Sequence, residues 1–185
     1  MPDRSWTLLS SRVVSDHRIF TLREDRYRIA PHDDERNFVV MDGPDWINII
    51  PLTDDGQVVL VRQFRHGVRQ VTLEIPGGMA NAGEDPQLAG LRELREETGY
   101  AARTVRPLGS VWPNPAIQTN RCHFFLAEGV HRVAEPEPDE SERIEVVTVP
   151  LDAIPGMVAR GEIGHSLVVL AFGLAGVLKG PLSKP

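Results

Sequence analysis

The segment 78–100, GMANAGEDPQLAGLRELREETGY, constrains this chain most, because a glycine-rich loop runs directly into a strongly charged helix pattern. Asp85 followed by Pro86 is typical of a helix start, since the carboxylate can cap free N–H groups and proline suits the first turn. Gly99 is a natural helix end. Between these signals, apolar residues recur at about helical spacing and predict the core-facing side: Leu88, Leu91 and Leu94. The segment therefore predicts a loop and then a helix between Asp85 and Gly99.

Three glutamates share one flank of this predicted helix, at positions i, i+3 and i+4: Glu93, Glu96 and Glu97. Like charges at that spacing cost roughly 0.2–0.5 kcal/mol per pair, and Arg92, four residues before Glu96, offsets part of this cost. Mg²⁺ prefers a few carboxylates together with substrate phosphate oxygens, which this flank could offer. The alternative is a solvated helix face, the usual role of such runs. The metal-site interpretation is favoured by loop glycines that let backbone approach a ligand: Gly77, Gly78 and Gly83.

The segment resembles the Nudix box, the signature of hydrolases that cleave a diphosphate linked to another group. Every glycine and fixed polar position of that pattern is filled, and the one departure is Tyr100, where the pattern prefers an aliphatic residue. The resemblance covers most of the chain, about residues 6–180. It implies an α/β fold, the Nudix α/β/α sandwich with a mixed sheet. Strand patterns with helix patterns on either side agree with that architecture.

Two runs before the box, VRQFR at 61–65 and LEIPGG at 73–78, resemble the ADP-ribose pyrophosphatase and nucleoside diphosphate sugar hydrolase branch. Pro115 lies 15 residues beyond Tyr100, an offset that marks the ADP-ribose group. The run around it, NPAIQTNR, departs from the commoner Ser-Pro-Gly version, and Pro115 is also interpretable as an ordinary loop proline. The resemblance implies hydrolysis of ADP-ribose or a related nucleoside diphosphate sugar to a nucleoside monophosphate and a sugar phosphate.

The same resemblance implies roles for the residues of the box. Glu93 and Glu97 should be the principal ligands of Mg²⁺, or alternatively of Mn²⁺. Glu96 should be a further ligand or a supporting carboxylate, and we count it among the catalytic residues. The remaining motif residues are expected to contribute a backbone carbonyl ligand (Gly77), the pair that fixes the loop onto the helix (Glu84 and Arg92) and the tight backbone positions (Gly78 and Gly99).

A general base is expected after the box, where relatives carry a glutamate on a loop. The acidic run at 135–142 supplies Glu140 as the first candidate and Glu142 as the second, and its closure over substrate would exclude water. A solvated acidic loop is the competing interpretation.

Substrate contacts are expected from a few other residues. Arg65 could bind a phosphate bidentately, although a surface ion pair is as common a role. Trp46 could stack on a base, and Tyr27 could do so across a dimer, whereas packing in a core or interface is the alternative for both. His123 reads as a buried strand histidine, and the histidines form no ligand spacing for zinc.

Composition and charge limit the binding partners and the cellular location that this chain is expected to have. A net charge of −6 argues against nucleic acid, and the longest apolar run, 167–178, is too short to span a bilayer. The single cysteine, Cys122, excludes an internal disulfide, and no signal peptide pattern begins the chain, so we expect a cytoplasmic protein. We expect an N-terminal strand extension (1–42), a Nudix domain (43–180) and a tail (181–185). The resemblance implies a homodimer in which the N-terminal strands embrace the partner.

Periodicity predicts the main elements. Strand patterns occupy residues 19–22, 38–41, 46–52, 57–65, 72–75, 105–112, 121–127 and 144–149, and helix patterns occupy 151–160 and 166–178. One competing function is a Nudix pyrophosphatase that acts on another nucleoside diphosphate derivative. Another is a non-catalytic Nudix-like nucleotide-sugar sensor, but this chain keeps every box carboxylate and has no spare basic domain. An isopentenyl diphosphate isomerase is a poor match, because its reaction needs a catalytic cysteine. The single cysteine of this chain, Cys122, lies in an apolar strand pattern instead.

Overall fold

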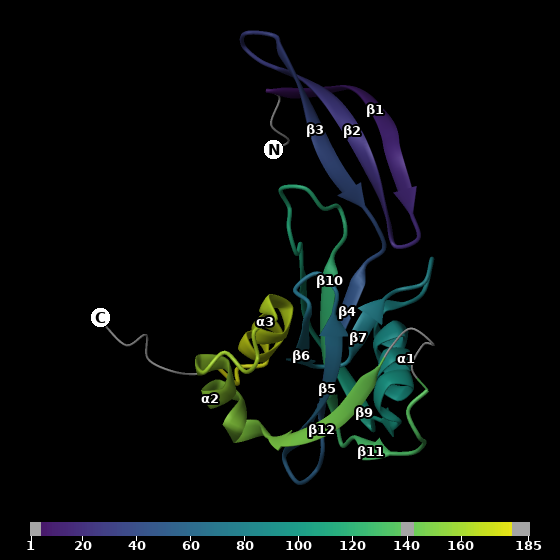
Figure 1. The fold of residues 1–185 in the computed structure, drawn as a ribbon, viewed down its shortest axis with the longest axis vertical. Helices are drawn as coiled ribbons and strands as arrows, with labels where there is room; N and C mark the ends of the chain where they lie inside the picture. The colour runs from purple at the N-terminus through teal and green to yellow at the C-terminus, as the bar shows by residue number, and fades with distance from the viewer. Residues whose placement is uncertain (1–4, 138–142, 179–185) are drawn as a thin grey trace, which may run out of the picture. The chain divides into compact units, whose positions relative to one another are not determined.

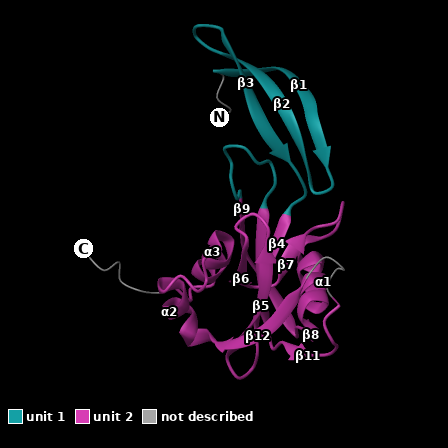
Figure 2. Ribbon diagram, viewed as in Figure 1, with its two compact units in different colours: residues 1–45, 112–121 teal, residues 46–111, 122–185 magenta. Residues whose placement is uncertain are grey.

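The structure is a computed structural model that describes residues 5–137 and 143–178. The chain divides into two compact units (Figure 2). Unit 1 contains residues 1–45 and 112–121, and unit 2 contains residues 46–111 and 122–185. These units do not have the same bounds as the expected N-terminal extension and Nudix domain. The expected domain boundaries remain a prediction. No helix among the described residues is both long and apolar enough to cross a membrane.

Unit 1 is built on an antiparallel meander of three strands, β1 (Trp6–His17), β2 (Phe20–Ile29) and β3 (Asp34–Asp42) (Figure 1). Three aromatic rings pack edge to face across it, with centroids 5.7–6.2 Å apart: Trp6, Tyr27 and Phe38. The segment 112–121 joins the end of β3, since Met41 donates from its N–H to the carbonyl of Ile117 at 2.7 Å. The strands are longer than the short patches predicted, because exposed strands lack a clear apolar alternation.

Unit 2 contains a mixed sheet in the order β12-β5-β4-β10-β9. Its strands are β4 (Trp46–Leu52), β5 (Gln57–Arg65), β9 (Thr104–Val111), β10 (Cys122–Glu128) and β12 (Ile144–Pro150). The strands predicted at residues 46–52 and 57–65 are confirmed as β4 and β5, which pair antiparallel next to their connecting turn. β4 and β10 pair in parallel, whereas the other neighbours are antiparallel.

Alternate residues of the central strands enter two different cores, one on each face of the sheet. One core includes Ile47, Val59 and Phe125 and contacts α1 (Pro86–Thr98) through Leu94. The other includes Ile50, Leu60 and Phe124 and is covered by α2 (Ile154–Ala159) and α3 (Ser166–Leu174). Figure 1 shows α1 on one side of the sheet and α2 and α3 on the other. The expected α/β/α sandwich is therefore confirmed.

The helix predictions need three corrections. The expected helix at 151–160 is a 3-10 turn, η1 (Leu151–Ala153), followed by the short α2, and α3 ends at Leu174 rather than at residue 178. Leu88 was wrongly assigned to the core face, for it is 60% exposed while Leu94 is fully buried. The two leucines are six positions apart in the sequence, which places them about 120° apart around the helix. Ala89 and Gly90 take the buried positions instead.

Where β4 and β5 separate, each of them pairs with a short strand instead of with the other. Near their turn, β4 and β5 pair at Leu52 and Val58. Farther along, β5 pairs with β6 (Gln70–Glu74) and β4 pairs with β7 (Gly77–Met79). A small second sheet, formed by β8 (Tyr100–Ala101) and β11 (His131–Arg132), follows α1. The opening between β4 and β5 brings the end of β6, all of β7 and one flank of α1 together.

Candidate active site

Both ends of α1 are fixed by local capping, as the sequence predicts. The carboxylate of Asp85 accepts from the backbone N–H groups of Gln87 at 2.9 Å and Leu88 at 3.1 Å. Gly99 ends the helix with φ of 74°, a conformation that glycine adopts without steric cost, and its N–H donates to the backbone carbonyl of Arg95. These caps fix which residues of α1 face the loop that precedes it.

Arg92 holds that loop against the helix. Its guanidinium donates two hydrogen bonds to Glu84, at 3.0 and 3.1 Å, and another to the carbonyl of Met79 at 3.1 Å. Asn81 donates to the same Glu84 carboxylate from its backbone and its side chain, both at 2.9 Å. The bonds from Arg92 and Asn81 lower the pKa of Glu84 to about 2, and the bonds to Glu84 raise the pKa of Arg92. The arrangement supports the predicted role of the Glu84–Arg92 pair, whose effect on activity stays a prediction.

The three glutamates of α1 lie against this locked loop. Arg92 donates to Glu93 at 2.8 Å and to Glu96 at 2.9 Å. Glu97 is 3% exposed and accepts the backbone N–H of Gly77 at 3.0 Å. A Cβ on Gly78 would lie 2.5 Å from Glu93 Oε1, so only glycine leaves the carboxylate its present position. The helix and β7 therefore place hard oxygen donors beside the half-buried backbone of Gly77 and Gly78.

The glutamates open onto a cleft of about 680 Å³ within unit 2. Its lining residues come from β4, β5, β6, β7, α1 and the start of α3: Trp46, Ile47, Asn48, Arg65, Glu74, Ile75, Gly77, Gly78, Met79, Asn81, Arg92, Glu93, Glu96, Glu97, His165 and Leu167. The cleft combines an acidic wall on α1 with a mixed wall formed by β5, β6 and α3. The structure thus brings together Gly77, Glu93, Glu96 and Glu97 from the box with Arg65 and Trp46 from outside it.

Arg65 forms the ion pair that was the alternative to phosphate binding. It donates to both oxygens of Glu74, at 2.9 and 2.8 Å, and Thr72 donates its hydroxyl to the same carboxylate. Burial alone would raise the pKa of Glu74, but the bonds from Arg65 and Thr72, with the charges of Arg65 and His165, lower it overall. Neither Glu74 nor His165 was predicted as a site residue. The run LEIPGG signals the first, and the position of a histidine just before an apolar helix pattern signals the second.

The other predicted site residues that the structure describes are not among those that line the cleft. Tyr27 and Pro115 belong to unit 1, the first in the aromatic cluster and the second in an exposed turn. Glu140 and Glu142 lie outside the described residues. His123 is half-buried in β10. Their proposed functions stay predictions.

The residues present fit a divalent cation by their chemistry. Over residues 5–137 and 143–178, no three histidine, cysteine or acidic side chains are gathered tightly enough to hold an ion as they stand, and Arg92 engages oxygens of both Glu93 and Glu96. Glu97, however, is a buried carboxylate, whose charge is costly without compensation. The carboxylate of Glu93 occupies the space that the missing side chain of Gly78 leaves. Together, Glu97 and Glu93 supply the carboxylate oxygens that Mg²⁺ prefers as ligands.

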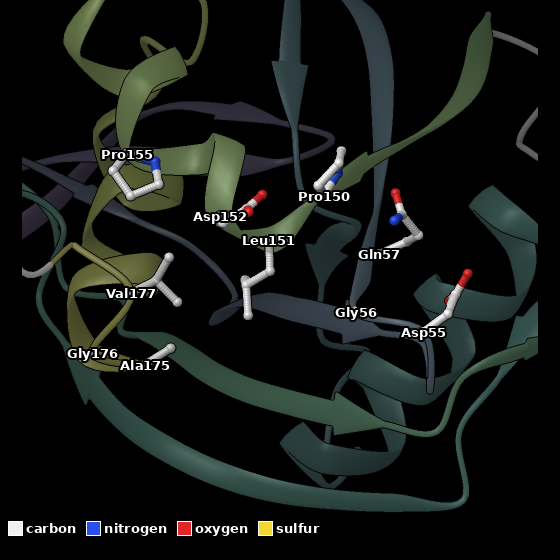
Figure 3. A pocket seen from close by; sticks show the side chains of 10 residues that line it. All are labelled: Asp55, Gly56, Gln57, Pro150, Leu151, Asp152, Pro155, Ala175, Gly176 and Val177. Carbon is white, nitrogen blue, oxygen red and sulfur yellow. The ribbon is translucent and has the colours of Figure 1, made fainter.

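A second hollow, of about 540 Å³, lies elsewhere in unit 2 (Figure 3). It is bounded by the β4–β5 turn, the end of β12 and the residues after α3, and its lining includes Asp55, Asp152 and Val177. None of its lining residues belongs to the glutamate flank or the glycine loop, so we assign the chemistry to the larger cleft.

Comparison with known proteins agrees with the geometry. The model of the NUDIX domain matches residues 44–171. An ADP-ribose pyrophosphatase of Bacillus subtilis is 35% identical over 121 residues, 65% of each chain, so the match spans just under two thirds of that relative. An ADP-ribose pyrophosphatase of Mycobacterium tuberculosis is 31% identical over 96% of this chain and 84% of its own.

Among solved structures, the crystal structure of an ADP compounds hydrolase superposes with a TM-score of 0.82 at 22% identity, over 94% of this chain and 93% of the other. That likeness supports the fold. The family model covers more than half of the chain and includes β4, the glycine loop and α1. This chain belongs to the Nudix hydrolase family.

Proposed function

We propose that this protein hydrolyses the diphosphate of ADP-ribose or a related nucleoside diphosphate sugar, giving a nucleoside monophosphate and a sugar phosphate. The observation that carries the proposal is the Glu84–Arg92 lock, which holds the glycine loop against the flank of Glu93 and Glu97 at the cleft. Relatives named ADP-ribose pyrophosphatase support the substrate class.

The cofactor in this proposal is Mg²⁺, with Mn²⁺ as the alternative. Glu93 and Glu97 would hold it, with Glu96 and the backbone carbonyl of Gly77 as further donors. When bound, a divalent ion neutralises charge on the diphosphate and lowers the pKa of an attacking water. Because Arg92 donates to both Glu93 and Glu96, it also limits repulsion among the carboxylates.

The chain's own residues would position the substrate. Trp46, at the start of β4, lines the cleft and offers an apolar ring to a base or sugar. Arg65 is fixed by Glu74, so it would present its guanidinium in a defined orientation rather than as a mobile charge. Glu140 remains our sequence-based candidate for the base that takes the proton from water, with Glu142 second. Tyr27 and Pro115 remain candidates for contacts outside the cleft.

We further propose a homodimer that depends on the residues before Asp42. Unit 1 exposes several large apolar side chains of its sheet, which a second copy could cover: Trp6, Leu8, Leu9, Val13, Val14 and Val39. Light scattering at micromolar concentration tests this, and a monomer would remove the shared site that involves Tyr27. A cytoplasmic location fits the single cysteine, Cys122, which can form no internal disulfide.

A substrate panel tests the function. ADP-ribose, GDP-mannose, UDP-glucose, NADH, a dinucleoside polyphosphate and coenzyme A are each incubated with Mg²⁺ or Mn²⁺, and products are identified by mass spectrometry. We expect cleavage of ADP-ribose or another nucleoside diphosphate sugar at the diphosphate. If binding occurs without turnover of any compound, the ligand-sensor alternative replaces the hydrolase.

A further inference from the structure

The part of the cleft lining that β5, β6 and α3 contribute includes a histidine outside the Nudix box. His165 comes directly before α3, and it lines the cleft together with Leu167 from the same helix and with Arg65, Glu74 and Ile75 from β5 and the end of β6. All of these residues belong to unit 2.

One ring nitrogen of His165 is already engaged. Its Nδ1 accepts the backbone N–H of Leu167 at 3.2 Å and so caps α3. A nitrogen that accepts a hydrogen bond carries no proton, so the neutral ring holds its proton on Nε2. The cap therefore fixes the tautomer and leaves Nε2–H as a hydrogen-bond donor of a residue that lines the cleft.

The charge of this wall differs from that of the α1 flank. Arg65 and Glu74 form a bidentate pair, so their charges offset each other, and the capping nitrogen of His165 carries no proton. Ile75 and Leu167 add apolar surface. Such a wall suits a neutral group that combines hydroxyl oxygens with carbon-bound hydrogens, which is the chemistry of a sugar. A phosphate is better matched to the glutamate flank of α1, where a cation could bind.

We propose that His165 is a substrate-recognition residue, whose Nε2–H donates a hydrogen bond to a ribose hydroxyl oxygen of the bound nucleoside diphosphate sugar. Leu167 packs against the carbon face of the same sugar. This inference rests on the proposed function and adds a residue that determines which sugar is accepted.

The first test separates recognition from capping. His165→Ser and His165→Thr keep side-chain oxygens that cap helices well but remove the distant N–H donor. We expect thermal midpoints close to that of the wild type, KM for ADP-ribose raised about 3–10-fold, as one lost hydrogen bond implies, and kcat within about twofold. Ser166→Ala, at the next and exposed position, is the matched control and should leave KM unchanged. His165→Ala removes both the cap and the donor.

The second test measures binding without turnover and identifies the sugar. Calorimetry in excess chelator compares AMP and ribose 5-phosphate on the wild type and on both capping variants. Weaker AMP binding assigns the contact to the nucleoside ribose, and weaker ribose 5-phosphate binding assigns it to the terminal ribose. Unchanged KM and affinities in both capping variants, or an effect confined to a destabilised His165→Ala, would overturn the inference while the hydrolase function stands. A wild type that neither binds nor cleaves any nucleoside diphosphate sugar would overturn both.

Discussion

Gly78 gives the sharpest structural test of the glutamate site. A Cβ at this position would lie 2.5 Å from Glu93 Oε1 and 2.8 Å from Oε2, whereas ordinary contact begins at 3.4 Å. In Gly78→Ala the carboxylate must therefore retreat by about 0.9 Å from its nearest present position. A misplacement of about 1 Å at a reacting centre can cost about 100-fold in rate, so we expect a loss of that order.

The same change should barely affect folding. The obstructing atoms are the end of a flexible side chain, and Gly78 does not have a positive φ. A shifted rotamer costs about 0.5–1.5 kcal/mol, which the smaller chain entropy of unfolded alanine offsets by about 0.4–1 kcal/mol. In contrast, a Cβ on Gly77 would collide with the backbone carbonyl of Ile47, so Gly77→Ala should destabilise by about 1–3 kcal/mol.

The assay is ADP-ribose turnover titrated with Mg²⁺, combined with thermal unfolding. Gly67→Ala is the matched control, because nothing lies within 4 Å of its Cβ position and its φ is not positive. We expect Gly78→Ala to need more Mg²⁺ and to turn over slowly at a nearly normal unfolding temperature. Normal turnover at low Mg²⁺ would refute the placement of Glu93 as a ligand.

Three further results are expected. The depressed pKa of Glu84, about 2, means that its bond to Arg92 stabilises the fold above the ordinary carboxyl pKa near 4.5 and is lost as pH falls toward 2. Glu84→Gln should therefore lower the unfolding temperature at pH 7 but not near pH 2, and an equal decrease at both pH values would contradict the ion pair. Leu94→Ala should destabilise by about 2–5 kcal/mol in chemical unfolding because Leu94 is fully buried, whereas Leu88→Ala at an exposed position should change little; similar losses would disprove the assigned helix face. Glu140→Gln should lower turnover about 10²–10⁴-fold with Mg²⁺ dependence intact and partial rescue at higher pH, and a wild-type rate would exclude it as the base.

Local signals allowed much of unit 2 to be predicted. Strands β4 and β5 follow their apolar patterns residue for residue, and α1 begins and ends at the residues that its caps indicate. These features depend on neighbours in the sequence. The glutamate flank was also foreseeable, because helical spacing alone places its carboxylates together.

Other features depend on distant partners and left little local signal. The pair of Arg65 and Glu74 forms only because β5 and β6 are neighbours, and the cleft exists because β4 and β5 separate. The capping role of His165 requires knowing where α3 begins. Strand β1 is largely exposed, so apolar periodicity could not predict its full length.

The most direct test of the central claim is the Mg²⁺ dependence of ADP-ribose hydrolysis by the wild type and by Glu97→Gln. Glutamine keeps an oxygen that can accept the N–H of Gly77 but removes the buried charge. We expect no turnover in excess chelator and, for the variant, a loss of at least about 100-fold with weaker apparent Mg²⁺ affinity. Glu145→Gln, at an exposed glutamate of β12, should behave like the wild type. Full activity in chelator, or normal turnover and metal dependence in Glu97→Gln, would contradict the claim that the box carboxylates hold a catalytic cation.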